Sequence, residues 1–204
     1  MMSTQMTNTT QIRPNLVPRP TTGRLRLRPT HRGRGFVVGV VDAAGPDTNG
    51  FAPKDRVAWR DTTDSLPELL LLDQDDVLGV PSWITDEQVV SYLGPGLIAR
   101  ALVRTAQDAA SGRNRPFGRG DDVRVDSSDE LVAEMTAAWA RSLGARVVDS
   151  GADVAIRDDR RARQGLGGSH GRLAQAAVEV FQAIRRGVFD DVEPLPATEG
   201  RLAA

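Results

Sequence analysis

The chain has 204 residues, of which 40% are hydrophobic and 26% are charged, and its formal net charge at pH 7 is -1. This length suits one large domain or two small domains that enclose a core. The absence of cysteine excludes disulfide bonds and thiolate metal ligands, and no apolar run approaches the roughly 18 residues of a membrane span. We therefore expect a cytoplasmic protein without a membrane segment.

The basic residues are unevenly distributed. Residues 1–41 hold seven arginines and no carboxylate, which leaves the rest of the chain acidic. We interpret residues 1–34 as a basic, mobile N-terminal arm with a first strand at Arg24–Arg28, where Leu25 and Leu27 alternate with arginine. Two alternatives are a targeting peptide, against which four prolines count, and a polyanion-binding arm, which lacks aromatic residues to stack on bases. Nucleic acid is accordingly not the expected partner.

Residues 35–80 have the pattern of strands and turns. Strands are predicted at Phe36–Val41, Arg56–Trp59 and Glu68–Leu72, and turn signals occur at Gly45-Pro46-Asp47 and Asn49-Gly50. These elements indicate a small twisted sheet or a partial barrel.

Residues 81–119 are predicted to form a helical bridge followed by a loop. Thr85 and Gln88 have the spacing of a capping box, which indicates a helix start. We expect Gly94-Pro95-Gly96 to break this helix into two pieces. The stretch from 110 to 121, rich in Gly, Arg, Asn and Pro, is the expected boundary loop.

The segment from Gly120 to Val148 has the pattern of a strand, a turn, a helix and a second strand. Asp122–Val125 is prone to β structure, and an apolar stripe that begins at Leu131 predicts a helix of about sixteen residues. Gly144 is expected to end the helix, and Ala145–Val148 to form a strand parallel to the first. Such a unit normally holds a dinucleotide at its first turn.

The turn itself contains no glycine and reads Ser127-Ser128-Asp129-Glu130. Ser127 and Glu130 have capping-box spacing, so they are expected to take up the backbone N–H groups that a phosphate would need. A carboxylate about 5 Å from a phosphate charge repels it by roughly 1.5 to 3 kcal/mol at an effective dielectric of 20 to 40. The turn is therefore interpreted as a capped helix start, with a working cofactor loop as the alternative.

Other chemistry is sparse. The glycine-rich segment Gly165–Gly171 is predicted to be a flexible loop with a Ser169 cap, and the alternative is an anion site with upstream arginines 160, 161 and 163. His31 and His170 have no cysteine partners, which argues against a zinc site, and His170 is expected at a helix start. Tyr92, the only tyrosine, is expected to pack, with proton donation as the alternative.

Several segments, taken in chain order, have counterparts in one known superfamily. They are Phe36–Gly45, Gly50–Val57, Gly120–Val123, Leu143–Val147, Gly151–Asp153 and Gly165–Gly187. In this order the chain resembles the medium-chain dehydrogenase/reductase superfamily, in particular its zinc-free quinone oxidoreductase and enoyl reductase branch. The resemblance implies an α/β fold, with a partial GroES-like β portion and a curtailed Rossmann-like parallel sheet with helices.

The resemblance also implies how this chain departs from its relatives. The turn glycines of the family fall at or near Ser127, Glu130, Leu131 and Ala133, and its substrate-side loop falls between Thr30 and Arg34, where no catalytic residue remains. If NADPH binds, the resemblance assigns it to Ser127, Ser128, Leu131, Val132 and Asp149. The implied organisation is an arm at 1–34, a GroES-like portion at 35–80, a bridge at 81–119, a Rossmann-like region at 120–190 and a tail at 191–204.

These observations favour a degenerate reductase-like protein that transfers no hydride, binds no cofactor or metal, and acts as an interaction or accessory module. A homodimer or another protein partner is expected to cover the incomplete sheet. One alternative is an NADPH-dependent quinone or enoyl oxidoreductase with a rearranged cofactor site. The other is a polyanion-binding protein that uses the N-terminal arginines.

Overall fold

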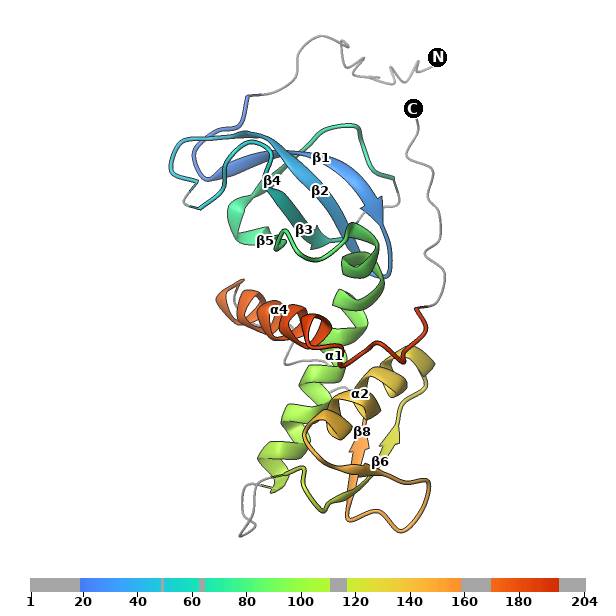
Figure 1. Ribbon diagram of the computed structural model, residues 1–204. Helices are drawn as coiled ribbons and strands as arrows, with labels where there is room; N and C mark the ends of the chain where they lie inside the picture. The colour runs from blue at the N-terminus through green and yellow to red at the C-terminus, as the bar shows by residue number, and fades with distance from the viewer. Residues whose placement is uncertain (1–18, 49, 63–64, 111–116, 159–169, 195–204) are drawn as a thin grey trace, which may run out of the picture.

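The described part of the protein combines an antiparallel sheet, a parallel sheet and three α-helices (Figure 1). The computed structural model describes residues 19–48, 50–62, 65–110, 117–158 and 170–194. The elements are β1 (Arg24–Arg32), β2 (Phe36–Ala44), β3 (Arg56–Arg60), β4 (Leu70–Asp73), the short helix η1 (Gln74–Asp76), β5 (Val77–Gly79), α1 (Asp86–Ala110), β6 (Asp122–Asp126), α2 (Glu130–Ser142), β7 (Arg146–Val147), β8 (Val154–Arg157) and α4 (His170–Arg185). No helix in the described ranges is both long and apolar enough to cross a membrane.

Five strands form the antiparallel sheet, in the order β4-β1-β2-β3-β5. The predicted strands are present, although the third begins at Leu70 and the sequence pattern did not predict β5. Alternation places Leu25 and Leu27 of β1 entirely inside, as the sequence pattern predicted. Their cluster is completed by Val37, Val41, Val57, Trp59 and Val77.

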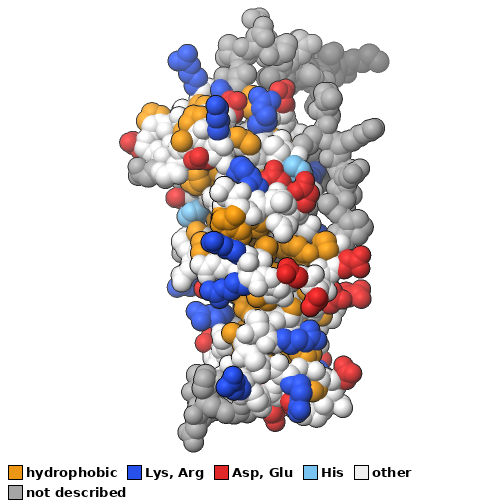
Figure 2. Space-filling view, in the orientation of Figure 1, with side chains coloured by type: hydrophobic (Ala, Val, Ile, Leu, Met, Phe, Trp, Pro, Cys, Tyr) orange, Lys and Arg blue, Asp and Glu red, His pale blue; other side chains and the backbone are white. Residues whose placement is uncertain are grey.

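Carboxylates on the neighbouring strand β2 and in the segments next to β3 and β4 pair with the arginines of β1. The Arg26 Nε group donates to Asp42 Oδ2 over 2.7 Å, and Arg28 Nη1 donates to Glu68 Oε1 over 2.9 Å. Arg32 likewise forms an ion pair with Asp61. Figure 2 shows basic and acidic side chains intermixed on the displayed face. Residues 1–18, which hold the rest of the predicted basic arm, lie outside the described residues.

Helix α1 is continuous over 25 residues, so the predicted break at Gly94-Pro95-Gly96 is wrong. The capping box at its start is confirmed, because the Thr85 N–H group donates to Gln88 Oε1 and the Gln88 N–H group donates to Thr85 Oγ1. The two glycines serve close packing instead. A Cβ atom at Gly94 would lie 2.5 Å from the Arg34 carbonyl oxygen, and one at Gly96 would lie 2.7 Å from a methyl group of Val180.

The first turn of α1 is tied to the antiparallel sheet by Asp86. Its carboxylate accepts hydrogen bonds from the Arg56 guanidinium and from the Thr30 hydroxyl. His31 lies between two acids, with Nδ1 3.1 Å from Asp86 Oδ2 and Nε2 3.2 Å from Glu87 Oε1. This histidine therefore belongs to the contact between sheet and helix.

Helix α4 packs against α1 and closes the core between the two sheets. Its buried residues join those of α1 and the antiparallel sheet in one cluster, contributing Ala176, Ala177, Val180 and Phe181. Arg100 of α1 donates two hydrogen bonds, of 2.7 and 2.8 Å, to the carboxylate of Glu179. These bonds hold the pKa of Glu179 below its ordinary value.

The second sheet is parallel, with β6 between β7 and β8. This confirms the predicted parallel pairing of the strands on either side of α2, although α2 has 13 residues rather than about sixteen. One face of the sheet is covered by α1 and α2, which pack on Val123 of β6 and Ile156 of β8. The α/β class and its two-sheet composition are therefore as predicted.

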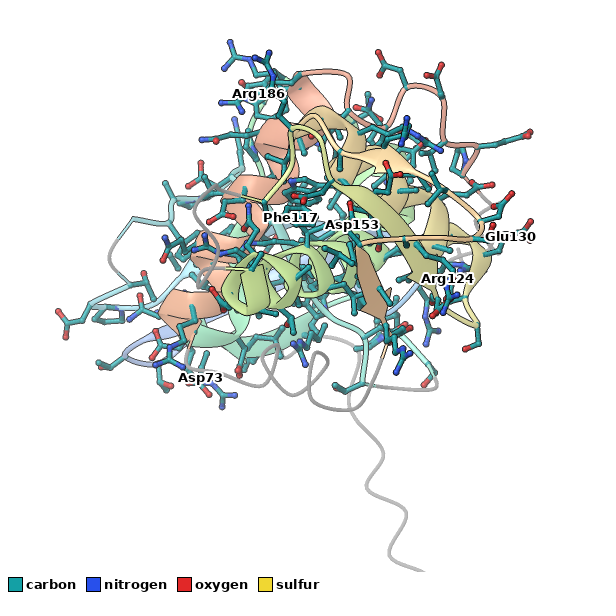
Figure 3. The ribbon with its side chains drawn as sticks, turned by 90° about the horizontal axis from the view of Figure 1, so that it is seen from below. Asp73, Phe117, Arg124, Glu130, Asp153 and Arg186 are labelled. Carbon is teal, nitrogen blue, oxygen red and sulfur yellow. The ribbon has the colours of Figure 1, made fainter. Side chains whose placement is uncertain are left out.

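The opposite face of the parallel sheet is polar. Side chains alternate along a strand, so Arg124 and Asp126 point away from the face that holds Val123. The Arg124 guanidinium donates twice to Asp126, which raises the pKa of Arg124. At the start of β6, hydrogen bonds from Arg146 lower the pKa of Asp122. Figure 3 shows Arg124 on the side of the sheet away from α1.

The close packing at Gly94 generates a prediction. Replacing a glycine inside a helix by alanine normally stabilises it by about 0.5 to 1 kcal/mol. We expect Gly94→Ala to destabilise the protein by about 1 to 3 kcal/mol, because the Arg34 carbonyl must move. Urea unfolding measures the difference. Gly171→Ala in α4, where a Cβ atom meets nothing within 4 Å, is the matched control and is expected to be neutral or stabilising. Equal effects of the two substitutions contradict the packing explanation.

Candidate functional site

The candidate site lies where β6 ends and α2 begins. Its turn follows Asp126 and leads directly into Glu130, the first residue of α2. β8 runs parallel to β6, and Arg157 pairs with Asp126, so the ends of both strands meet at this turn. In open α/β sheets, ligands bind at this edge of the strands.

The start of α2 is capped by Asp129. The Val132 N–H group donates to Asp129 Oδ1 over 3.2 Å, and the Ala133 N–H group donates to the Asp129 carbonyl oxygen over 2.9 Å. The predicted capping box of Ser127 and Glu130 is therefore wrong, because the helix begins two residues later than that spacing required. The underlying expectation, that a side chain of the turn takes up a free N–H group, is confirmed.

Ser127 supports the turn from the other side. Its hydroxyl accepts a hydrogen bond of 3.2 Å from the Asp129 N–H group and donates one of 2.9 Å to Asp158 Oδ2, just after β8. The turn is thus tied to the neighbouring strand as well as to its own helix.

Arg34 reaches the same turn from the antiparallel sheet. Its Nη1 atom lies 3.5 Å from Asp129 Oδ1, with the two side chains 43% and 37% exposed. Arg34 sits in the short turn between β1 and β2, which packs closely on α1 through Gly33. Sequence reasoning missed this residue, because only the fold brings two segments 95 positions apart into contact.

The predicted cofactor residues are only partly brought together. Ser127 and Ser128 lie in the turn, and the side chains of Leu131 and Val132 are buried in the core beneath it. Asp149 is exposed in the bend after β7, and β7 pairs only with the first two residues of β6. This pairing ends at Val123, three residues before Asp126, after which the turn begins.

A dinucleotide of the kind the fold implies fits this turn poorly. Glycines normally let the backbone approach the pyrophosphate, and no glycine occurs between Gly120 and Gly144. The Val132 N–H group already bonds the Asp129 carboxylate, which also carries the charge that a phosphate would bring. Glu130 adds a second exposed negative charge at the helix start. The residues of this turn therefore do not match the pyrophosphate of a nicotinamide cofactor.

The remaining candidate residues have other partners or lie outside the described ranges. The Tyr92 hydroxyl donates to the Val192 carbonyl oxygen over 2.9 Å, and burial, with a smaller effect of Asp190, raises the pKa of Tyr92. His170 begins α4, as expected. Residues 159–169, which include most of the glycine-rich loop and its arginines, are not among the described residues. Within the described part of the chain, no three His, Asp or Glu side chains gather to hold a metal ion.

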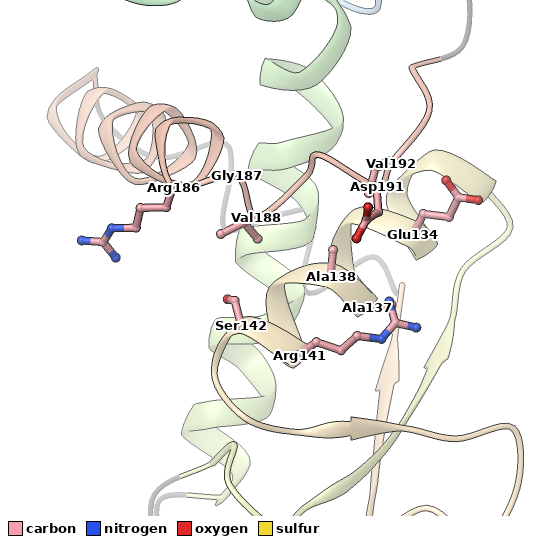
Figure 4. A pocket seen from close by; sticks show the side chains of 10 residues that line it. All are labelled: Glu134, Ala137, Ala138, Arg141, Ser142, Arg186, Gly187, Val188, Asp191 and Val192. Atoms are coloured by element: carbon pink, nitrogen blue, oxygen red, sulfur yellow. The ribbon is translucent and has the colours of Figure 1, made fainter.

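A separate groove runs along the exposed face of α2. It has a volume of about 600 Å³ and lies between α2 and the segment that follows α4 (Figure 4). It is lined by Glu134, Ala137, Ala138, Arg141, Ser142, Arg186, Gly187, Val188, Asp191 and Val192. We call it the α2 groove. No sequence pattern singled it out, because half of its wall comes from a segment distant in the chain.

Comparison with known proteins identifies the fold. No family model and no curated protein matches the sequence. Solved structures do match: a mycobacterial protein complexed with NADPH superposes with a TM-score of 0.58 at 18% identity, over 84% of this chain and 83% of that one. A quinone oxidoreductase of Pseudomonas syringae pv. Tomato gives 0.59 at 14% identity, over 85% and 83%. A mycobacterial quinone oxidoreductase gives 0.50 at 24% identity, over 74% of this chain and 55% of its own length.

The chain has the fold of the medium-chain dehydrogenase/reductase superfamily. The resemblance found in the order of sequence segments is thus confirmed at the level of fold. The antiparallel sheet corresponds to a GroES-like portion and the parallel sheet to a Rossmann-like portion. At these identities the likeness establishes the architecture, and the site must be judged from its own residues.

The observed cap generates a second prediction. Asp129→Ala removes the acceptor for the Val132 N–H group and is expected to destabilise the protein by about 1 kcal/mol in urea unfolding. Asp129→Asn keeps an oxygen at the same position and should stay close to the wild-type stability. If Glu130→Ala proves more damaging than Asp129→Ala, the capping box predicted from the sequence would be correct after all.

Proposed function

We propose that this protein is a quinone-oxidoreductase-like protein that transfers no hydride and acts as an interaction or accessory module. The observation that carries this proposal is the occupation of the α2 start by Asp129. Its carboxylate takes the Val132 N–H group and lies beside the Arg34 guanidinium. These are the two kinds of donor that a cofactor phosphate would use.

Energetics support this proposal. Displacing Asp129 from its cap leaves a helix N–H group to be satisfied by the ligand, and the displaced carboxylate then repels the incoming phosphate. Moving it away also separates it from Arg34, the contact that connects the turn to the antiparallel sheet. Nucleotide binding would therefore have to overcome both the cap and the added negative charge.

The form of the parallel sheet also supports an accessory role. Ion pairs of Arg124, Asp126, Arg146 and Asp122 cover its open face, so this face is compatible with solvent or with a polar partner. The α4 helix closes the core onto α1, which gives the protein a continuous interior between the two sheets.

A second candidate function is supported by the fold. A structurally similar mycobacterial protein is complexed with NADPH, and other similar structures are quinone oxidoreductases. On this alternative the chain reduces quinones or enones with NADPH held at a rearranged site. The polyanion alternative has less support, since β1 arginines that belong to the proposed arm are paired with carboxylates.

Calorimetry with NADPH separates the two candidate functions. We expect no heat of binding at millimolar nucleotide and no NADPH oxidation with a panel of quinones and enones. A quinone oxidoreductase run in parallel controls for the assay, and circular dichroism shows that the protein is folded. Binding in the micromolar range would contradict the argument from the Asp129 cap, and turnover above the background rate would establish the oxidoreductase alternative.

A further inference from the structure

His31, near the end of β1, faces a carboxylate at each of its two ring nitrogens. Nδ1 lies 3.1 Å from Asp86 Oδ2, and Nε2 lies 3.2 Å from Glu87 Oε1. Nδ1 is buried and has no hydrogen-bond partner among the described residues, so the Asp86 carboxylate is the polar group that it meets. The next residue of β1, Arg32, is paired with Asp61 instead.

The two protonation states of the His31 ring differ in how they suit this position. A neutral imidazole carries one N–H group and one lone pair, whereas the imidazolium carries two N–H groups. Whichever nitrogen of a neutral His31 holds the proton, the lone pair of the other nitrogen faces a carboxylate. Only the imidazolium presents an N–H group to both acids.

The neighbouring charges also favour the imidazolium. Arg56 of β3 pairs with Asp86, so the group around the ring holds two carboxylates, those of Asp86 and Glu87, and one guanidinium. β2, which pairs with β1 on this side, places the apolar Val38 opposite His31. A protonated His31 therefore balances the charges of the group, and a neutral His31 leaves one carboxylate uncompensated.

The two contacts of His31 join the end of β1 to the first turn of α1. Gly33, two residues further on, packs so closely on the same helix that a Cβ atom there would lie 2.6 Å from the Val90 carbonyl oxygen. Arg34 follows directly and lies beside Asp129 at the start of α2. The charge of His31 thus acts where the β1–β2 turn is held against both helices.

We propose that His31 is a pH-sensitive clamp: when protonated, it holds the end of β1 and the following turn against the start of α1, and it weakens this hold when it loses the proton. The clamp needs both carboxylates in their ionised form. Hydrogen bonds from a backbone N–H group and from Thr85 lower the pKa of Glu87, with a smaller contribution from the charge of His31. Glu87 therefore keeps its charge at a lower pH than an ordinary glutamate.

The direction of the pH effect follows from the proton that the clamp holds. A group that binds its proton more tightly in the folded state than in the unfolded state stabilises the fold at low pH and loses this contribution as the pH rises. Histidine in an unfolded chain titrates near about pH 6.5. The clamp therefore acts fully at about pH 5.5 and fades toward about pH 8.

Urea unfolding of the full chain at these two pH values tests the clamp. When the pH is lowered from about 8 to about 5.5, the unfolding equilibrium constant of the wild type should fall about three- to tenfold further than that of His31→Gln, whose side chain is uncharged at both. His170→Gln removes the other histidine of the chain and is the matched control. Its pH dependence should equal that of the wild type.

Glu87→Gln is the second variant, because the Glu87 side chain is 71% exposed and its replacement should leave the fold intact. It should show a pH dependence between those of the wild type and His31→Gln. Equal pH dependence of the wild type and His31→Gln overturns the clamp, and so does a pH dependence that His170→Gln abolishes. If Glu87→Gln retains the whole effect, the two-sided clamp is wrong. These outcomes do not depend on whether NADPH binds.

Discussion

The contact on which the turn between β6 and α2 depends is the one between the Asp129 carboxylate and the first turn of α2. It satisfies the Val132 N–H group, and it places a negative charge beside Arg34 of the antiparallel sheet. Ser127 joins the same turn to Asp158 after β8. The end of the parallel sheet, the start of the helix and the β1–β2 turn are thus connected by side chains of the protein itself. In the proposed function, these side chains take the place of a cofactor phosphate at the start of α2.

Close packing at glycines keeps the core continuous between the two sheets. The β1–β2 turn approaches α1 through Gly33 and Gly94, and α4 approaches it through Gly96. At each of these glycines a Cβ atom would come within 3.0 Å of a neighbouring atom, so the glycine backbone lies closer to its neighbour than other residues permit. Helix α1 can therefore contact both sheets along its length, and α4 completes the interior between them.

Local patterns predicted the elements well, and their failures have physical causes. The strands, the Thr85 box and the parallel pairing of β6 and β7 follow from alternation, capping chemistry and handedness, all of which act within a few residues. The predicted break at Pro95 is wrong because α1 continues through the proline. The helix is packed there on two sides, with Gly94 against the β1–β2 turn and Gly96 against α4. The cap was assigned to Ser127 instead of Asp129 because both residues have suitable oxygens, and only the backbone decides between them. Arg34 and the α2 groove depend on contacts between distant segments, which no local pattern contains.

The most direct test of the central claim is the amide NMR signal of Val132 during an NADPH titration. If Asp129 holds the start of α2 against external anions, the Val132 and Ala133 resonances should stay in place up to millimolar nucleotide. In an Asp129→Gly variant, which lacks the cap, the same two resonances should shift during the NADPH titration. A saturable shift of these two amides in the wild-type protein would show that a nucleotide phosphate displaces the carboxylate, and the central claim would then be wrong.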